Sequence, residues 1–290
     1  AYKYWDHSSQ VEDAPAPILL TDPTRLNPET ASEIGRLQAR IVVILGGVGA
    51  ISPAVAASIK KIPGVAEVQR VWGENAPGTA KKIFERMRSA ADHNRTPRPD
   101  TAIIATQMNF PDALAASSPA AANNMPILLS SQDFIPRETL DALAEGNIEK
   151  VIIVGGPAAI STKAELQLKQ KGYQVLKRIW GNSEYDTAIA IAKSNGYFSF
   201  DYTTVYVARG DWFTDALAGG ASASWMIYED EFGTLLTAPA PIVLVEPGNV
   251  PKATQDWLSA NRNTVADVYV LGGPGAIADS VSNSISQTLF

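Results

Sequence analysis

Short, continuously apolar runs alternate along the chain with longer stretches whose apolar side chains recur at helical spacing. In the middle of the chain, the runs that predict strands are residues 101–105, 127–129, 151–154 and, at an edge, 174–178. The stretches between them that predict helices are residues 111–122, 136–144 and 161–171. Strands that are apolar on both faces are typical of parallel sheets covered by helices. The alternation therefore predicts open α/β sheets built from right-handed strand–helix–strand units.

The pattern returns along the chain, so the sequence contains an internal repeat. Pro-Ile-Leu-Leu at residues 17–20 recurs at 126–129 and, as Pro-Ile-Val-Leu, at 241–244, with starts 109 and 115 residues apart. A strand that ends in Gly-Gly and leads into Ala-Ile-Ser occupies residues 43–52 and 152–161, and a third copy at 269–278 ends in Ala. Several motifs in one order at nearly one period indicate tandem copies of a single module.

Two further motifs occur only twice, so the copies are unequal. Arg-x-Trp-Gly followed by Thr-Ala occurs at residues 70–80 and 178–188, and Phe-x-Asp-Ala-Leu-Ala at 110–115 and 213–218. The first copy has neither of the two helices that these motifs predict. We expect a partial first module over residues 1–72, a second module over 73–180 and a third over 181–290, which makes about two and a half modules. Modules of one chain bury their faces against each other, so we expect them around a common centre.

Composition excludes several kinds of chemistry. The chain has 24 Lys and Arg against 30 Asp and Glu, and this acidic balance argues against a nucleic-acid partner. It has no Cys, which removes disulfides, thiolate metal sites and cysteine nucleophiles. Its two histidines, His7 and His93, fall in predicted loops. We therefore expect no catalytic residue, no cofactor and no metal site, and the absence of a long apolar run predicts no membrane span.

The third module contains an insertion. Asp112 lies 14 residues before Pro126, whereas Asp215 lies 26 residues before Pro241, so about 12 residues are added near residues 223–236. Aromatic side chains lie there beside three consecutive acids. The insertion is either an interaction patch or a longer helix and hairpin that covers the sheet edge.

Together these motifs resemble the cell wall binding repeat 2 family of Gram-positive bacteria, over nearly the whole length from Pro17 to Val281. The resemblance implies Rossmann-like or flavodoxin-like modules, usually three in a row, in a pseudo-threefold arrangement. It also implies a secreted protein of the cell wall or cell surface, held noncovalently by an anionic polymer, either teichoic-acid-like or a polysaccharide. Catalysis in such proteins belongs to a separate fused domain, so the resemblance implies a binding module and not an enzyme.

Eight residues are our candidates for ligand binding in clefts between the modules: Arg70, Trp72, Asp112, Arg178, Trp180, Tyr185, Arg209 and Asp215. The three arginines would donate to phosphate or carboxylate groups. For Arg70 and Arg178 the alternative is a strand-end salt bridge to the neighbouring module. The tryptophans are either core residues or platforms for a sugar ring. The two aspartates fit the first turn of a helix, and no second acid recurs beside both of them.

The linker departs from the family's usual Arg-x-x-Gly-x-x-Arg-Tyr-x-Thr-Ala pattern. Residues 178–188 keep Tyr185 but have Glu184 where the family has Arg, and the earlier copy has Ala76 and Pro77 in place of Arg-Tyr. The loss of this cation in both copies weakens the case for strong polyanion binding.

The sequence is also compatible with two other functions. A surface-layer or self-assembling protein is one, because the incomplete first module leaves a sheet edge and apolar faces for a second copy, a partner chain or residues 1–16 to complete. An enzyme that binds a nucleotide or another small molecule is the other, because a strand that ends in Gly-Gly before a helix resembles a phosphate-binding turn. The simpler reading of that turn is structural, with Ser52 and Ser161 as helix N-caps.

Overall fold

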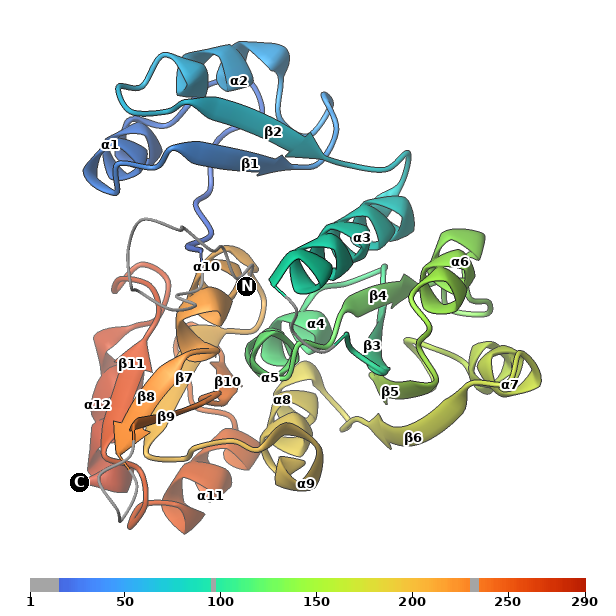
Figure 1. The fold of residues 1–290 in the computed structure, drawn as a ribbon. Coiled ribbons are helices and arrows are strands. Elements are labelled where there is room, and N and C mark those ends of the chain that lie inside the picture. The colour runs from blue at the N-terminus through green and yellow to red at the C-terminus, as the bar shows by residue number, and fades with distance from the viewer. Residues whose placement is uncertain (1–15, 95–97, 230–234) are drawn as a thin grey trace.

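The computed structural model describes residues 16–94, 98–229 and 235–290, which form three lobes in chain order (Figure 1). The first lobe consists of α1 (Pro28–Arg36), β1 (Ile41–Leu45), α2 (Pro53–Lys60) and β2 (Glu67–Val71). β1 and β2 pair in parallel, with Ile41 opposite Glu67. A small core of its own, centred on Ile44, Val55 and Ile59, holds this lobe together.

The second lobe is a complete parallel sheet covered by helices. Its elements are α3 (Ala76–Asn94), β3 (Thr101–Thr106), α4 (Pro111–Ala115), α5 (Ser117–Ala122), β4 (Ile127–Ser130), α6 (Arg137–Glu145), β5 (Lys150–Val154), α7 (Thr162–Gln170) and β6 (Gln174–Ile179). The strand order is β4-β3-β5-β6, and every pair is parallel. All six residues of β3 are buried, which is why this strand is apolar on both faces. β6 lies at an edge, as the sequence predicts.

The third lobe repeats most of this topology. Its elements are α8 (Glu184–Ala192), α9 (Asn195–Phe198), β7 (Thr204–Arg209), α10 (Thr214–Ala223), β8 (Met226–Glu229), β9 (Leu235–Ala238), β10 (Ile242–Val245), α11 (Lys252–Ala260), β11 (Asp267–Val270) and α12 (Asp279–Leu289). The order β10-β7-β11 corresponds to β4-β3-β5 and is also parallel. β8 and β9 form an antiparallel hairpin at the predicted insertion, and residues 230–234 within it lie outside the described residues.

These findings confirm the predicted fold class, an α/β protein of tandem Rossmann-like modules. The main sheet of each lobe is parallel, and the lobes occupy the corners of a triangle in Figure 1. The first lobe supplies only counterparts of α6, β5, α7 and β6, because α1 follows the Pro-Ile-Leu-Leu motif, the Gly-Gly turn follows β1 and the Trp follows β2. The first module is therefore incomplete within the described residues.

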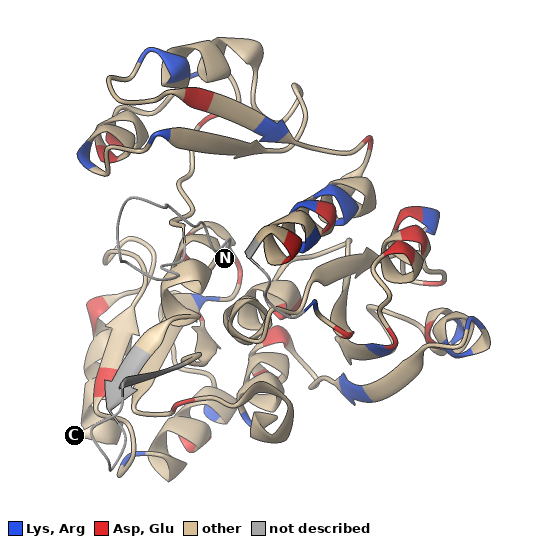
Figure 2. Ribbon diagram, viewed as in Figure 1, with Lys and Arg blue, Asp and Glu red and all other residues tan. Residues whose placement is uncertain are grey.

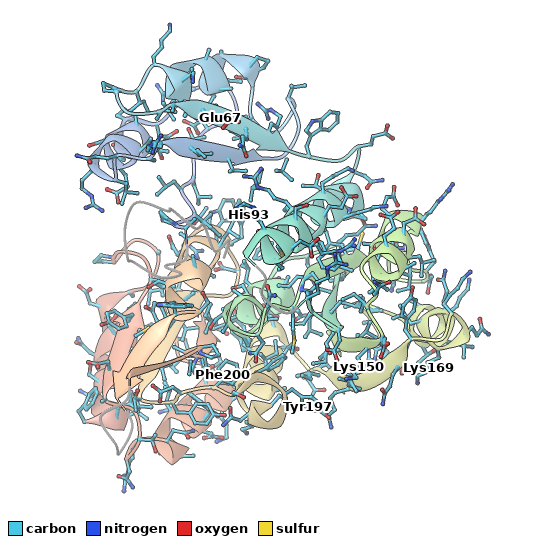
Figure 3. All side chains as sticks on the ribbon, viewed as in Figure 1. Glu67, His93, Lys150, Lys169, Tyr197 and Phe200 are labelled. Atoms are coloured by element: carbon cyan, nitrogen blue, oxygen red, sulfur yellow. The ribbon has the colours of Figure 1, made fainter. Side chains whose placement is uncertain are left out.

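Two local predictions are wrong. Residues 111–122 form two helices, α4 and α5, instead of one. Pro119 has no amide hydrogen for the carbonyl of Ala115, and its ring would clash with that carbonyl in a continuous helix. The chain turns at Ala116 instead, where Ser117 Oγ donates to the carbonyl oxygen of Leu114 at 2.7 Å. His93 lies in the last turn of α3 and not in a loop, as Figure 3 shows; His7 is outside the described residues.

The second and third lobes share one hydrophobic core. Small side chains of α4 and α5, such as Ala115 and Ala120, pack in one cluster with Ala188 of α8 and Ala216 of α10. Alanines at these positions let the helix backbones approach closely. Ser118 is fully buried at the junction, and its Oγ donates to the carbonyl oxygens of Ala223 at 3.0 Å and Ala240 at 2.6 Å. The two lobes thus meet as a packed interface that positions the site described next.

Candidate functional site

The Gly-Gly turns lie at the carboxyl ends of β1, β5 and β11, and the first glycine of each has positive φ. Gly155 has φ +112°, and a Cβ there would lie 2.8 Å from Oδ2 of Asp112. Gly272 stands in the same relation to Asp215. Two motifs far apart in sequence therefore meet because parallel strands end at one edge of the sheet. A carboxylate this close to the turn would repel the negatively charged pyrophosphate that a nucleotide-binding turn holds.

Arg178 and Arg70 hold these turns from within their own modules. Arg178 Nη1 donates to the carbonyl oxygens of Gly155 and Ile160, both at 2.9 Å, and Nη2 forms a 2.8 Å ion pair with Glu165. Arg70 donates in the same way to the carbonyl oxygens of the first turn, including that of Gly46 at 2.7 Å. The ion pair of Arg178 is thus made within its own module, not with the neighbouring one. Hydrogen bonding to Lys169 and to Arg178 keeps the pKa of Glu165 below its ordinary value.

Trp180 and Trp72 pack against the second glycine of the same turns. A Cβ at Gly156 would lie 2.8 Å from Cε3 of the Trp180 ring, and one at Gly47 would lie 3.4 Å from that of Trp72. The rings remain 45% and 51% exposed, respectively. One face of each tryptophan is therefore packed against its glycine, while much of the rest is exposed to solvent. Each ring thus combines the two roles predicted from the sequence, packing residue and platform for a sugar ring.

The segment after Trp180 connects the second and third modules. Gly181 N–H donates to Thr187 Oγ1 at 3.0 Å, and Gly73 makes the same bond to Thr79 in the earlier copy. Thr187 is in turn hydrogen-bonded to the carboxyl group of Asp112. The Thr-Ala motif of one module therefore contacts the Asp-Ala-Leu-Ala motif of the module before it.

Asp112 is the most perturbed acid of this junction. Only 8% of the residue is exposed, and burial raises the pKa of its carboxyl group to about 6. The charge of Glu184, at the start of α8, raises it further, while the hydrogen bond from Thr187 opposes the shift. The sequence shows no acid that recurs beside both Asp112 and Asp215, but Asp112 does have an acidic neighbour, Glu184, which comes from the next module. A comparison of motifs within one repeat does not find it. The signal in the sequence was Glu184 itself, which departs from the family's Arg.

A cleft of about 510 Å³ opens at this junction. Its walls are the turn after β5, the start of α4, the linker from Trp180 into α8, and Gly210 and Asp211 after β7. The polar groups of the lining include Asn109, Asn182 and the carboxylates of Asp112, Glu184 and Asp211, and no Lys or Arg of the described residues belongs to it. Figure 2 shows acidic segments of α4 and α8, two helices in contact, at this place.

Tyr185 and Arg209 lie beside the cleft. A Cβ at Gly210 would lie 2.7 Å from Cε1 of Tyr185, so this ring covers the start of the loop after β7. Burial raises the pKa of the Tyr185 hydroxyl. Arg209 makes a two-pronged ion pair with Asp211, with both N–O distances at 2.7 Å. All three candidate arginines are thus engaged with groups of their own module.

Asp215 occupies the position of Asp112 in the third module, but no helix like α8 covers it among the described residues. Trp212 and Phe213, just before it, remain 53% and 38% exposed, and their rings stack at 5.7 Å. The structure therefore brings five of the eight candidates to the junction or its supporting turn: Asp112, Arg178, Trp180, Tyr185 and Arg209. Asp215 lies instead at the corresponding turn of the third module, against Gly272. Arg70 and Trp72 belong to the separate first turn.

The described ranges contain neither a membrane-spanning helix nor a cluster of metal-ligating side chains. None of their helices is sufficiently long and apolar to cross a membrane. Residues 16–94, 98–229 and 235–290 also bring together no group of three or more His, Asp and Glu that would hold a metal ion.

Comparisons with known proteins agree with this architecture. The chain is 31% identical to the N-acetylmuramoyl-L-alanine amidase LytC of Bacillus subtilis over 218 residues, 75% of this chain and 38% of that protein. It is 27% identical to the amidase enhancer of the same organism, over 95% of this chain and 34% of that protein. The chain thus spans under two fifths of the curated relatives that it matches.

Solved structures give the same result. Cwp6 from Clostridium difficile matches 94% of this chain and 40% of its own with a TM-score of 0.78 at 26% identity. Cwp8 from the same organism, at 22% identity and a TM-score of 0.73, shows the same fold. The sequence profile of Cell wall binding domain 2 (CWB2) matches residues 70–165 and 178–282, more than half of the chain. This chain therefore belongs to the cell wall binding domain 2 family.

Proposed function

We propose that this chain is a non-catalytic anchoring module that holds a cell-wall polymer in the cleft between its second and third modules. The observation that carries the proposal is the meeting of four repeated motifs at one cleft: the Gly-Gly turn, the Trp, the Thr-Ala helix and the Asp helix. A polymer that crosses this cleft would contact both modules at once. The proposed boundaries at residues 73 and 181 place each wall of the cleft in a different module.

We further propose that the polymer is anionic and that the protein is secreted to the cell surface. Arg70, Arg178 and Arg209 are engaged within their own modules, so the anionic groups need other cations. α3 carries four basic residues within residues 81–88, and Figure 2 shows this concentration of Lys and Arg. Two of them, Lys81 and Lys82, form 2.7 Å ion pairs with Glu145 and Glu85, and ion pairs near the surface are weak enough to exchange for the anionic groups of a polymer. We place the anionic contacts there, outside the cleft.

Sedimentation with purified cell-wall sacculi tests this function. We expect the chain to sediment with intact sacculi, to be released by added salt because charge attraction is screened, and to lose binding once the anionic polymer is extracted. Undiminished binding after extraction would refute the anionic part of the proposal. A failure to sediment with intact sacculi would refute the anchoring function itself.

The relatives are more than twice as long as the region that this chain matches, so the activity of a whole relative does not by itself belong to this chain. The amidase name of one relative supports the proposal that CWB2 modules bring another activity to the wall. Assay of this chain alone for release of wall fragments tests its non-catalytic nature, and measurable release would contradict it.

Self-association, or a partner that completes the first module, is a second candidate. The exposed Trp212 and Phe213 beside the half-buried Asp215 favour it, because the corresponding acid of the second module, Asp112, is buried against the next module. Light scattering coupled to gel filtration over a range of concentrations tests it. A monomer at every concentration, both for the wild type and for Trp212→Ala, would remove self-association.

A further inference from the structure

We infer that the cleft between the second and third modules recognises an amine-bearing sugar unit of the wall polymer, with the ring on Trp180 and the ammonium group toward Asp112 and Glu184. This inference rests on the proposed anchoring function and specifies its ligand. The anionic groups of the polymer would then bind at another surface, and this cleft would bind its sugar unit.

The cleft has the size and the platform that a sugar needs. Its volume of about 510 Å³ falls within the range of small-molecule sites, ~300–1,000 Å³. The Trp180 ring is 45% exposed and lines the cleft, while Gly156 fixes its position from behind. An aromatic ring held in this way offers a flat apolar surface to the C–H face of a sugar and attracts a nearby cation.

The polar groups around the platform suit hydroxyl and ammonium donors. Asn109 and Asn182 are exposed at the rim of the cleft, where their amide groups can pair with hydroxyl groups. When ionised, the carboxylates of Asp112 and Glu184 can only accept hydrogen bonds, so they need donors such as hydroxyl or ammonium groups. Asp112 is paired with Thr187, whereas Glu184 has no hydrogen-bonding or cationic partner that the structure records within the described residues.

The charge of the lining excludes an anionic group from the cleft. The lining contains Asp112, Glu184 and Asp211 but no Lys or Arg. A phosphate or carboxylate would meet two uncompensated acids at short range, whereas an ammonium group would relieve the repulsion between them. Glu184 stands in this chain where the family has Arg, so the negative charge of the cleft is a property of this particular sequence.

Isothermal titration calorimetry with two matched sugars tests the inference. A β-1,4-linked glucosamine tetramer carries free amines, and the N-acetylglucosamine tetramer has the same rings without the charge. We expect the glucosamine tetramer to bind the wild-type chain at least about tenfold more tightly at about pH 6.5, a difference of ~1.4 kcal/mol. It should also compete with sacculi for the protein.

Three variants separate the contributions. Glu184→Gln should bring the affinity ratio of the two tetramers toward one, because the ammonium loses a partner while the ring contact remains. Trp180→Ala should weaken both tetramers by about tenfold or more. Trp72→Ala is the matched control, since Trp72 sits on Gly47 in the same way but lies outside this cleft, and it should bind as the wild type does.

Equal affinity for the two tetramers, or an unchanged ratio in Glu184→Gln, would overturn the charge assignment. Unchanged binding in Trp180→Ala, with circular dichroism showing a folded protein, would overturn the location. If neither tetramer binds while the wild-type chain still sediments with sacculi, the inference fails and the anchoring function stands. If the wild-type chain does not sediment, the anchoring function fails independently of the sugars.

Discussion

Neutralising Asp112 should stabilise the junction between the second and third modules. The pKa of this carboxyl group rises from 3.8 to about 6 on folding, because it is buried and faces Glu184. A shift of this size corresponds to a loss of about 3 kcal/mol in the free energy of unfolding when the group is ionised. Asp112→Asn keeps the shape and an acceptor for Thr187 but removes the charge. We therefore expect the variant to be more stable than the wild type by up to ~3 kcal/mol above pH 7.

The difference should depend on pH with a definite sign. The folded state holds the proton more tightly than the unfolded chain, so the stability associated with neutral Asp112 is fully present below about pH 4. It is lost as the pH rises through about 6. The advantage of Asp112→Asn should therefore fall to roughly half at pH 5 and vanish below pH 4. The difference in free energy of unfolding between variant and wild type does not contain the contributions of the other carboxyl groups that titrate in this range, because both proteins share them.

Urea unfolding followed by tryptophan fluorescence at several pH values measures this difference. Asp215→Asn is the matched control, because Asp215 holds the same position in its module but is only half-buried, and it should change stability by less than ~0.5 kcal/mol. An Asp112→Asn variant that is less stable than the wild type at pH 7.5, or whose advantage does not change with pH, would refute the reasoning. In that case Asp112 would be ionised and stabilising in the folded protein.

Three further predictions concern the repeated motifs. Gly181→Ala should destabilise by more than ~2 kcal/mol in urea unfolding, because its Cβ would lie 2.6 Å from the carbonyl carbon of Asp186, whereas Gly49→Ala, with open space around it, should be tolerated. Arg178→Lys should lower stability by about 2–4 kcal/mol, because the single nitrogen of an ammonium group cannot reach Gly155, Ile160 and Glu165 together, as the four hydrogen bonds of the guanidinium do; a melting temperature equal to that of the wild type would contradict this. Ser161→Ala should reduce stability by ~1 kcal/mol through loss of the N-cap, and calorimetry showing no change would argue that the cap is not used.

Much of the fold can be read from the sequence because its signals are local. Continuous apolar runs predict β3 and β5, and apart from Lys150 at the start of β5 every residue of these two strands is buried in the parallel sheet. The spacing of the repeated motifs predicts the tandem modules, since each motif belongs to one turn or one helix start. The N-cap roles predicted for Ser52 and Ser161 are confirmed by their bonds to Val55 and Ala164. The exception is α4–α5, where Pro119 interrupts an otherwise helical pattern.

The sequence by itself thus determined the module, its repeat and most of the residues at the site, because hydrophobic period, turn chemistry and helix starts act over a few neighbouring residues. Only the tertiary structure decided which partners these residues take. Arg178 turns inward to a Gly-Gly turn and Glu165, and Asp112 meets Thr187 and Glu184 across a module boundary. The physical reason is that burial and charge pairing depend on distances through space. Packing two modules around shared alanines brings together groups that lie some seventy residues apart in the chain.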